Sequence, residues 1–368
     1  MRLSTIWMQI SVLFLKYLRF KCWLLLTNRA DQGYSADMKV SCKVRAAAKI
    51  NIGLQVGRPN VDGYHAIAGI MQAVSLFDFL QFSMEDETSG IAVYGGFDCP
   101  VVETTIYRAA DRFYEAIGTE PHVRIDVEKN IPAKAGLGGG SSDAGATLLC
   151  LNYLYENILN DDQLLTLAKS VGADVPFFVR GASRSDCSCG ACVVGGIGDV
   201  LEPIASRTDL GILLVYPGFG VSTAWAYKKL DMYRASGKVG SGNISNGASA
   251  IVDSTNPVAL ANPIVDTYQS NIRNWKYDPS FENSFQAMLE EEFPIYGILE
   301  GGLRKVGAEF VSISGSGSCL YGIFPSIAGA EHAKAELLAS LKSDLNENTI
   351  QSISLFAKRP LERSIYLE

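Results

Sequence analysis

The chain contains very little histidine and no long basic stretch. Its three histidines, His65, His122 and His332, lie far apart among 368 residues. Their spacing suggests neither a catalytic triad nor a set of metal ligands. The net charge is −7, and no cluster of lysine and arginine indicates a nucleic-acid partner. Any catalysis in this protein is therefore expected to use other residue types.

Cysteine is present eight times, but without the spacing of a metal site. Cys187, Cys189 and Cys192 form the tightest group. They lack a nearby histidine or fourth cysteine, whereas structural zinc is held by four ligands. We therefore assign no metal ligands from the sequence. A loop of reduced thiols in the cytosol is the better interpretation, so we expect a cytoplasmic protein.

A long uninterrupted hydrophobic run is also missing. Residues 6–26 are apolar but include Lys16, Arg19 and Lys21, and charges in mid-span are costly in a bilayer. The charges also lie in the wrong place for a signal peptide. A basic amphipathic helix on a membrane surface is one alternative. We favour another, in which residues 1–37 are an extension upstream of a natural start at Met38. No integral membrane partner is expected.

The remaining composition is that of a globular protein long enough for two domains, with 48% hydrophobic and 19% charged residues. Strand and helix patterns alternate, and several strands are apolar on one face only. This favours a mixed α/β or α+β sandwich over a buried parallel sheet. Strands are expected at 40–56, 73–82, 122–127, 175–178, 209–216, 309–313, 319–324 and 351–356. Helices are expected at 105–117, 163–171, 281–292, 296–306 and 328–341, and a surface insertion at 234–250.

A glycine-rich turn at 131–144 runs directly into a helix pattern. Glycines 136 and 138–140 allow tight backbone folding and close approach to a ligand. Ser141 and Ser142 are suitable N-cap residues, and Asp143 suits the positive end of the helix. Such a turn is typical of a phosphate site, although a flexible linker has a similar composition. The turn lacks the Lys-Ser/Thr ending of a P-loop and the sequel of a Rossmann fingerprint.

Asp174 and Lys49 are the candidate catalytic pair. Asp174 lies between a helix end at Gly172 and an apolar run, where a carboxylate is partly buried and needs a partner. Lys49 projects from the polar face of an otherwise apolar strand. Beside a phosphate loop, an aspartate can accept the proton of an attacking hydroxyl, and a lysine can offset developing charge. The alternatives are a turn-forming aspartate and a surface lysine.

Two further turns have candidate roles. Tyr64 and His65 follow Asp62 and Gly63 in a turn, where an aromatic ring can stack on a nucleobase. The alternative is a tyrosine that packs at a domain edge. A Gly-Ser turn at 314–318 can line a phosphate as a backbone nest, or it is an ordinary hairpin loop.

Together these segments resemble the GHMP kinase superfamily. The similarity runs from Met38 to the C-terminus and rests on five motifs in order. They are AKINIGL at 48–54, DGYH at 62–65, GLGGGSSDA at 136–144, GADVPFF at 172–178 and SGSGS at 314–318. The resemblance implies an α+β, two-domain GHMP kinase fold. An N-terminal S5-like βαβ domain would span 38–206, and a smaller α/β-sandwich C-terminal domain would span 207–368.

The turn DGYH and the motif GADVP narrow the implied activity. It is ATP-dependent phosphorylation, with Mg2+, of the 2-hydroxyl of 4-diphosphocytidyl-2-C-methyl-D-erythritol, in the non-mevalonate pathway of isoprenoid biosynthesis. A homoserine or mevalonate type of GHMP kinase is the nearest alternative. A non-catalytic nucleotide-binding protein of the same fold is another. The implied assembly is a monomer or homodimer.

The resemblance also assigns roles to individual residues. Asp174 and Lys49 match the catalytic aspartate and its companion lysine. Asn51, Tyr64, His65 and, more loosely, Tyr227 match substrate-binding positions. Gly315, Ser316 and Gly317 belong to the second loop. The residues that match the ATP-binding loop are Pro132, Ala133, Lys134, Ala135, Gly136, Leu137, Gly138, Gly139, Gly140, Ser141 and Ser142.

The chain departs from the family pattern at several places. Residues 183–189 look inserted, Gly195 stands where a glutamate is common, and Asp199 replaces a closing glutamate. The segment 234–250 and the leader before Met38 are further additions. None of these differences changes Lys49 or Asp174.

Overall fold

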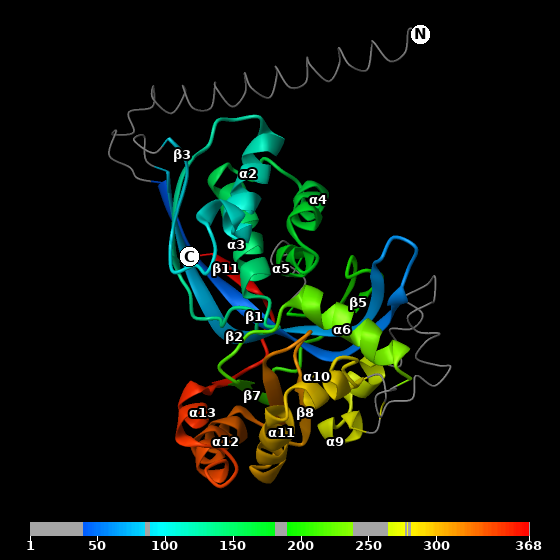
Figure 1. Cartoon of the computed structure of the whole chain (residues 1–368). Coiled ribbons are helices and arrows are strands. Elements are labelled where there is room, and N and C mark those ends of the chain that lie inside the picture. The colour runs from blue at the N-terminus through cyan, green and yellow to red at the C-terminus, as the bar shows by residue number, and fades with distance from the viewer. Residues whose placement is uncertain are drawn as a thin grey trace.

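The strands of the chain form two sheets, which lie one above the other in Figure 1. The computed structural model describes residues 40–84, 89–180, 190–237, 264–276, 278 and 281–367. The first sheet has seven strands, with the order β11-β1-β2-β4-β3, while β5 pairs with β2 and β6 pairs with β5. The second sheet has four strands in the order β10-β7-β9-β8.

A long hairpin, β1 (Val40–Pro59) and β2 (His65–Met84), forms the centre of the first sheet. The predicted turn at 61–65 is confirmed. The Asn60 side chain accepts hydrogen bonds from the N–H groups of Asp62 and Tyr64, and Gly63 has a φ of +82°. Pairing between the two strands shifts in register at Ala47/Ala48, Ile52/Leu54 and Val56/Pro59. Such irregularities bend a hairpin.

A βαβ unit completes this sheet. Strands β3 (Gly90–Tyr94) and β4 (His122–Glu128) pair in parallel, and helix α2 (Thr105–Ile117) connects them. The predicted helix at 105–117 and strand at 122–127 are confirmed, whereas the sequence pattern gave no strand at 90–94. The short helix η1 (Val101–Glu103) precedes α2, and β5 (Ala191–Gly195) and β6 (Val200–Ile204) form a hairpin beside β2.

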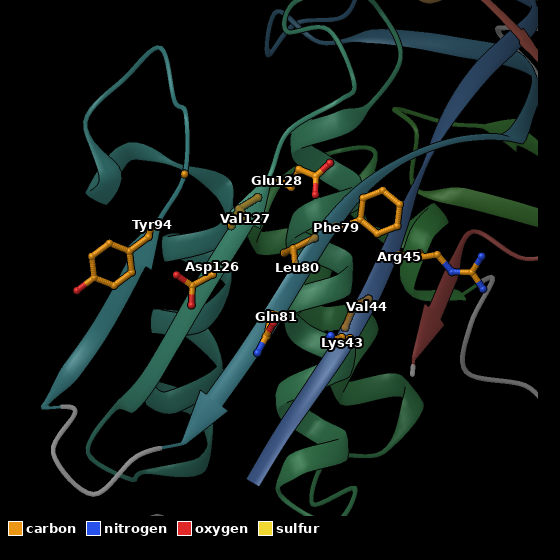
Figure 2. Close-up of a pocket in the computed structure, with 11 residues that line it drawn as sticks. Lys43, Val44, Arg45, Phe79, Leu80, Gln81, Tyr94, Asp126, Val127 and Glu128 are labelled. Atoms are coloured by element: carbon orange, nitrogen blue, oxygen red, sulfur yellow. The ribbon is translucent and has the colours of Figure 1, made fainter. Parts of the chain in front are cut away.

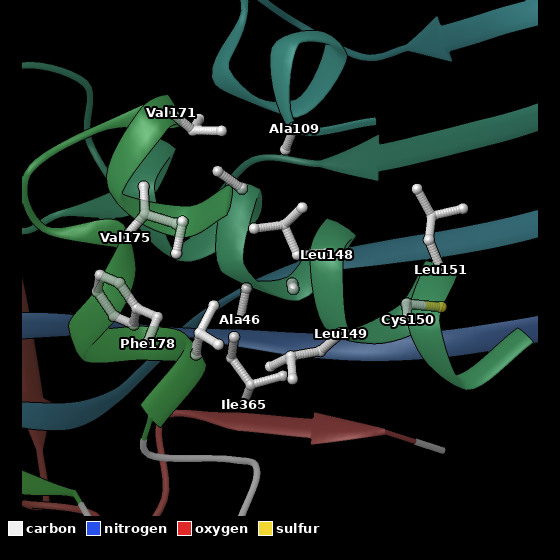
Figure 3. Packing of buried hydrophobic residues seen from close by; sticks show 14 of the residues in the cluster. Ala46, Ala109, Leu148, Leu149, Cys150, Leu151, Val171, Val175, Phe178 and Ile365 are labelled. Carbon is white, nitrogen blue, oxygen red and sulfur yellow. The ribbon is translucent and has the colours of Figure 1, made fainter. Parts of the chain in front are cut away.

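Helices α2, α3 (Gly139–Leu154), α4 (Asp161–Val171) and α5 (Val175–Arg180) pack on one face of the first sheet (Figure 1). Their buried side chains meet those of the strands in one hydrophobic core, part of which is shown in Figure 3. Leu148 and Leu151 of α3 and Phe178 of α5 belong to it, together with Ala46 of β1. This burial of an apolar surface positions both the start of α3 and the start of α5.

The opposite face of the same sheet carries charged and aromatic side chains. Lys43, Arg45, Phe79, Gln81 and Asp126 are among the residues that line a cavity of about 590 Å³ there (Figure 2). The alternation of the strands explains this, because Val44 and Leu80 point to the helical side and their neighbours point away. The cavity contains none of the predicted site residues.

The second sheet is antiparallel throughout and is covered by helices. Its strands are β7 (Gly211–Tyr216), β8 (Phe310–Ile313), β9 (Leu320–Phe324) and β10 (Ser354–Lys358). The helices are α6 (Thr223–Ala235), α9 (Ile272–Trp275), α10 (Gln286–Glu292), α11 (Ile295–Lys305), α12 (Ile327–Ser340) and α13 (Glu347–Ser352). The last strand, β11 (Ile365–Leu367), returns to the first sheet and pairs with β1.

Four predicted elements are wrong or incomplete, and one of them is the helix expected at 281–292, which begins only at Gln286. Residues 175–178 form helix α5 and not a strand, since a proline at the second helical position needs no hydrogen-bond donor there. The strand expected at 351–356 begins only at Ser354, after the end of α13. Arg234 and Ala235, expected to start an insertion, belong to α6.

Several predictions concern residues outside the described ranges. These are the leader at 1–37, the insertion at 183–189 with Cys187 and Cys189, and residues 238–250 of the expected surface insertion. Cys192 is described and is buried in β5. Within the described ranges, no helix has both the length and the apolar character needed to cross a bilayer.

Candidate active site

The glycine-rich loop connects β4 to α3 through a series of left-handed residues. Lys134, Gly136 and Gly138 have φ values of +53°, +74° and +70°. Gly138 is the N-cap of α3, so the helix starts at Gly139. The predicted capping roles of Ser141 and Ser142 are therefore wrong, because both lie within the first turn of the helix. The prediction that the loop runs directly into a helix is confirmed.

Close neighbours leave no room for a side chain at Gly136 or Gly138 of this loop. A Cβ on Gly136 would lie 2.0 Å from the carbonyl oxygen of Ser314, and one on Gly138 would lie 2.9 Å from Cγ of Lys49. Glycine thus permits the loop to contact both the second Gly-Ser loop and β1. The first N–H groups of α3 have no partners within the helix and carry its positive dipole end, which suits an anion.

The second Gly-Ser loop at 314–318 packs against the first. The Ser314 hydroxyl donates to the carbonyl of Gly136 at 2.9 Å, and the N–H of Cys319 donates to the carbonyl of Ala135 at 3.1 Å. The Asn283 amide holds the loop from the other side, through the carbonyls of Ile313 and Gly315. The two loops, 178 residues apart in sequence, therefore form one continuous backbone surface.

Lys49 and Asp174 meet beside this surface. Lys49 Nζ lies 3.4 Å from Oδ2 of Asp174 and donates a hydrogen bond of 2.6 Å to Oδ1 of Asn51. The Lys49 side chain is only 4% exposed, whereas that of Asp174 is 30% exposed. Asp174 lies in the turn immediately before α5, so its carboxylate is accessible from the cavity while the lysine is covered by the glycine loop.

One cavity of about 570 Å³ joins these groups. The glycine loop, the first turn of α3 and the second loop at Gly315 and Ser316 line it. So do Lys49, Asn51 and Asp174, together with Thr223 and Tyr227 of α6. A cavity of this size suits a small ligand held by a few convergent polar groups. The cavity can therefore hold a phosphate donor at the glycine loops and a phosphate acceptor beside Asp174.

A buried charged cluster, not predicted from the sequence, adjoins the loop. Lys129 makes ion pairs with Asp78 and, at 2.6 Å, with Oδ2 of Asp143. Asp78 also accepts the N–H groups of Asn130 and Ile131. A signal was present in the sequence, because Asp78 is the only acidic residue of strand β2.

Asp143 is the unusual member of this cluster. It is 2% exposed, and its Oδ1 has no hydrogen-bond partner among the described residues, although it lines the cavity. Burial raises the pKa of Asp143 to about 7, while the nearby Lys129 ammonium opposes that rise. The cluster therefore contains two carboxyl groups, those of Asp78 and Asp143, and one ammonium group, that of Lys129. It lies at the edge of the candidate phosphate site.

The predicted base-binding residues are only partly brought together. His65 and Tyr227 are in contact, with ring centroids 4.9 Å apart, and Nε2 of His65 lies 3.0 Å from Oδ1 of Asp231. Burial and the nearby Asp174 carboxylate raise the pKa of Tyr227 to about 12. Tyr64 is 61% exposed, and neither Tyr64 nor His65 lines the cavity, whereas Tyr227 does. The sequence analysis missed Asp231, which lies one helical turn after Tyr227.

The fold and this paired-loop site define a GHMP kinase. A family model described as the GHMP kinases N terminal domain matches residues 104–182. A homoserine kinase from Cytophaga hutchinsonii superposes with a TM-score of 0.59 over 91% of this chain and 99% of that structure. It is only 16% identical, so this likeness shows the fold alone.

Two further comparisons give the particular family. The 4-diphosphocytidyl-2-C-methyl-D-erythritol kinase of Treponema pallidum is 36% identical over 77% of this chain and 90% of its own length. A crystal structure of 4-(cytidine 5'-diphospho)-2C-methyl-D-erythritol kinase is 29% identical. It superposes with a TM-score of 0.61 over 86% of this chain and 99% of that structure. The chain belongs to the 4-diphosphocytidyl-2-C-methyl-D-erythritol kinase family. It is a phosphotransferase that uses ATP.

Proposed function

We propose that this protein transfers the γ-phosphate of ATP to the 2-hydroxyl of 4-diphosphocytidyl-2-C-methyl-D-erythritol. The observation that carries the proposal is the meeting of Lys49 Nζ and Asp174 Oδ2, 3.4 Å apart, in the cavity lined by both glycine loops. This pair combines a proton acceptor with a cation at the mouth of an anion site. Phosphoryl transfer needs little more than positioning and charge stabilisation.

In the proposed reaction, Asp174 accepts the proton of the substrate hydroxyl. The hydroxyl oxygen then bonds to the γ-phosphorus as the bond from that phosphorus to the bridging oxygen of ADP breaks. Lys49 is positioned by Asn51, and its ammonium group offsets negative charge on the transferred phosphoryl group. The products are a phosphate monoester and ADP, and the proton remains on Asp174 until solvent removes it.

The ATP phosphates are proposed to bind at 132–142. The left-handed residues Gly136 and Gly138 and the free N–H groups at the start of α3 support this assignment. Gly315, Ser316 and Gly317 are proposed to close the same site, because their loop is hydrogen-bonded to the first one. Lys134 forms an exposed ion pair with Asp98 at 2.8 Å, which places a cation at the rim of the cavity.

Magnesium is proposed to accompany ATP, and the residues present fit it. Among the described residues, Oδ1 of Asp143 is a buried carboxylate oxygen that lines the cavity and has no hydrogen-bond partner. Hard oxygen donors of this kind are the ligands that Mg2+ takes in proteins. When bound, the ion would offset negative charge on the phosphates of ATP. Asp143 would hold it, while Lys129 keeps the second carboxylate oxygen of Asp143 in place.

The cytidyl group is proposed to bind at the hairpin tip. The half-buried His65 and Tyr227 are proposed to form its wall, and Tyr64 is proposed as an exposed ring that stacks on the outer face of the base. Asn51, buried beside Lys49, is proposed to contact the substrate between the base and the reacting hydroxyl.

The proposed domain division is 38–206 and 207–368. The start of the second sheet at Gly211 supports it. Strand β11 crosses back to the first sheet, so the last residues of the chain complete the N-terminal domain.

A substrate panel tests the proposal. Phosphate transfer from ATP is measured with the cytidyl substrate, mevalonate and homoserine side by side. We expect turnover of the cytidyl substrate and little or none of the other two. Preference for mevalonate or homoserine would overturn the assignment, and binding of ATP without transfer to any of the three would indicate a non-catalytic protein.

A further inference from the structure

Helix α6 presents one face to the tip of the β1–β2 hairpin. Tyr227, Asp231 and Arg234 are spaced four and three residues apart and so lie on the same side of the helix. The ring of Tyr227 contacts His65, both carboxylate oxygens of Asp231 lie within 3.2 Å of its Nε2, and Arg234 donates to the carbonyls of Val56 and Gly57. Three independent contacts thus join one helical face to the residues beside the proposed base site.

The contact with Asp231 determines which nitrogen of His65 carries the proton. An ionised carboxylate only accepts hydrogen bonds, so Nε2 must be the donor. In the neutral ring Nδ1 is then an acceptor. No hydrogen bond to Nδ1 is found among the described residues, and the His65 side chain is 9% exposed. The ring is therefore held by one nitrogen and presents the other as an acceptor.

An acceptor at this position distinguishes the two common pyrimidines. Cytosine carries an exocyclic amino group, which donates, whereas uracil carries a carbonyl oxygen at the same place, which accepts. A ring nitrogen that can only accept would bind the amino group of cytosine and repel the carbonyl oxygen of uracil. With uracil, Nδ1 of His65 and the carbonyl oxygen of the base would both be acceptors without a donor, which costs binding free energy. The discrimination therefore comes from rejection of uracil as much as from attraction of cytosine.

We propose that Asp231 is a positioning residue that fixes the His65 tautomer and thereby makes the site select cytosine over uracil. This inference rests on the proposed function, and it adds a residue that acts through His65 without contacting the substrate. A purely structural role would be to hold α6 on the hairpin. Arg234 provides the matched control, because it holds the same helix to the same hairpin without touching His65.

The experiment compares wild type, Asp231→Ala and Arg234→Gln with the cytidyl substrate and its uridyl counterpart. For Asp231→Ala we expect the cytidyl-to-uridyl ratio of kcat/KM to fall about tenfold, the worth of about one hydrogen bond between neutral groups. Its KM for ATP and its kcat with saturating cytidyl substrate should stay within about twofold of wild type. Arg234→Gln should lower thermal stability but keep the ratio.

An unchanged ratio in Asp231→Ala would overturn the inference, as would an equal loss in Arg234→Gln. If the alanine variant does not fold, Asp231→Asn replaces it with the same expectation, because an amide can present a donor as well as an acceptor to Nε2. Calorimetric binding of cytidine and uridine diphosphates, with the ATP site filled by a non-hydrolysable analogue, gives the same comparison without turnover. A wild type that does not phosphorylate the cytidyl substrate would refute the proposed function itself, which is a separate outcome.

Discussion

At the scale of single residues, the site is built from polar side chains that are buried and paired. Lys49 and Asn51 are each 3% exposed, although the alternation of their strand predicts a solvent-facing edge. The edge is covered because the N–H of Lys49 donates to the glycine loop and that of Asn51 to Ser314 of the second loop. A buried ammonium needs a partner, and Asn51 and Asp174 supply it.

Asp143 gives a prediction about stability and pH. Because burial raises its pKa to about 7, the folded protein holds a proton between about pH 4 and pH 7 that the unfolded chain has released. The free energy of unfolding of metal-free wild type should therefore fall, relative to Asp143→Asn, by about 1 to 4 kcal/mol as the pH rises through this range.

Urea unfolding at about pH 5 and about pH 8 measures this difference. The control is Asp111→Asn, since Asp111 is an exposed aspartate of α2 and makes no ion pair with the cluster among the described residues. Its pH profile should run parallel to that of wild type. If the pH profile of Asp143→Asn also runs parallel to that of wild type, ionisation of the buried Asp143 carboxyl does not destabilise the folded protein, and the prediction is wrong.

Tyr64 gives a prediction about substrate affinity. Stacking on a base contributes about 1–3 kcal/mol, so Tyr64→Ala should raise KM for the cytidyl substrate by roughly tenfold or more and leave KM for ATP unchanged. Tyr64→Phe keeps the ring and should behave like wild type. Steady-state kinetics with both substrates varied would decide, and an unaltered KM in the alanine variant would remove Tyr64 from the site.

At the scale of elements, the two loops are held together through positions that only glycine can occupy. Gly136→Ala should disrupt their contact, because the new Cβ would lie 2.0 Å from the Ser314 carbonyl oxygen. Gly118→Ala is the matched control. Gly118 has a similar left-handed φ of +64°, but nothing lies within 4 Å of its Cβ position. The control isolates the backbone strain, about 1 kcal/mol.

We expect Gly136→Ala to lower the free energy of unfolding by clearly more than Gly118→Ala and to weaken ATP binding severely. Gly118→Ala should leave ATP affinity unchanged. Denaturant unfolding and calorimetric titration with ATP measure the two effects. Equal losses in both variants would mean that the loops do not depend on each other.

The sequence predicted most elements, and its errors have physical causes. Helices such as 105–117 and hairpin strands such as 309–313 were found because their periodicity and turns agree with their burial. Helix α5 was missed because Val175, Phe177 and Phe178 are typical of strands, and their burial against α3 overrides that preference (Figure 3). The start of α3 was misplaced because Gly138, and not a serine, adopts the capping conformation.

The candidate site was predicted in its parts but not in its arrangement. Motifs identified Lys49, Asp174 and both glycine loops, and the fold brings them to one cavity. The cluster of Asp78, Lys129 and Asp143 and the contact of Asp231 with His65 were not predicted. These pairs are 14 to 166 residues apart in sequence, so only the folded chain brings them together.

At the scale of the whole molecule, the end of the chain completes the first sheet. The N–H of Ala47 donates to the carbonyl of Ser364, whose hydroxyl in turn donates to the carbonyl of Phe178 in α5. Ile365 is 3% exposed and belongs to the core beneath α3 (Figure 3). The C-terminal residues therefore support helix α5, which begins directly after Asp174.

Ile365→Ala should lower the free energy of unfolding by about 2–4 kcal/mol through the cavity it leaves. Leu367→Ala, two residues further along and 43% exposed, should cost less than about 1 kcal/mol. Thermal or denaturant unfolding measures both. If the two variants lose the same amount, the last strand is not part of the core.

The central claim is that Asp174, paired with Lys49 beside the glycine loop, takes the proton during phosphoryl transfer. The most direct test is the turnover of the cytidyl substrate by Asp174→Asn, with ATP binding measured on the same preparation. The account predicts a fall in kcat of roughly 10²–10⁴-fold with ATP affinity retained. An asparagine variant that turns over at the wild-type rate would contradict it.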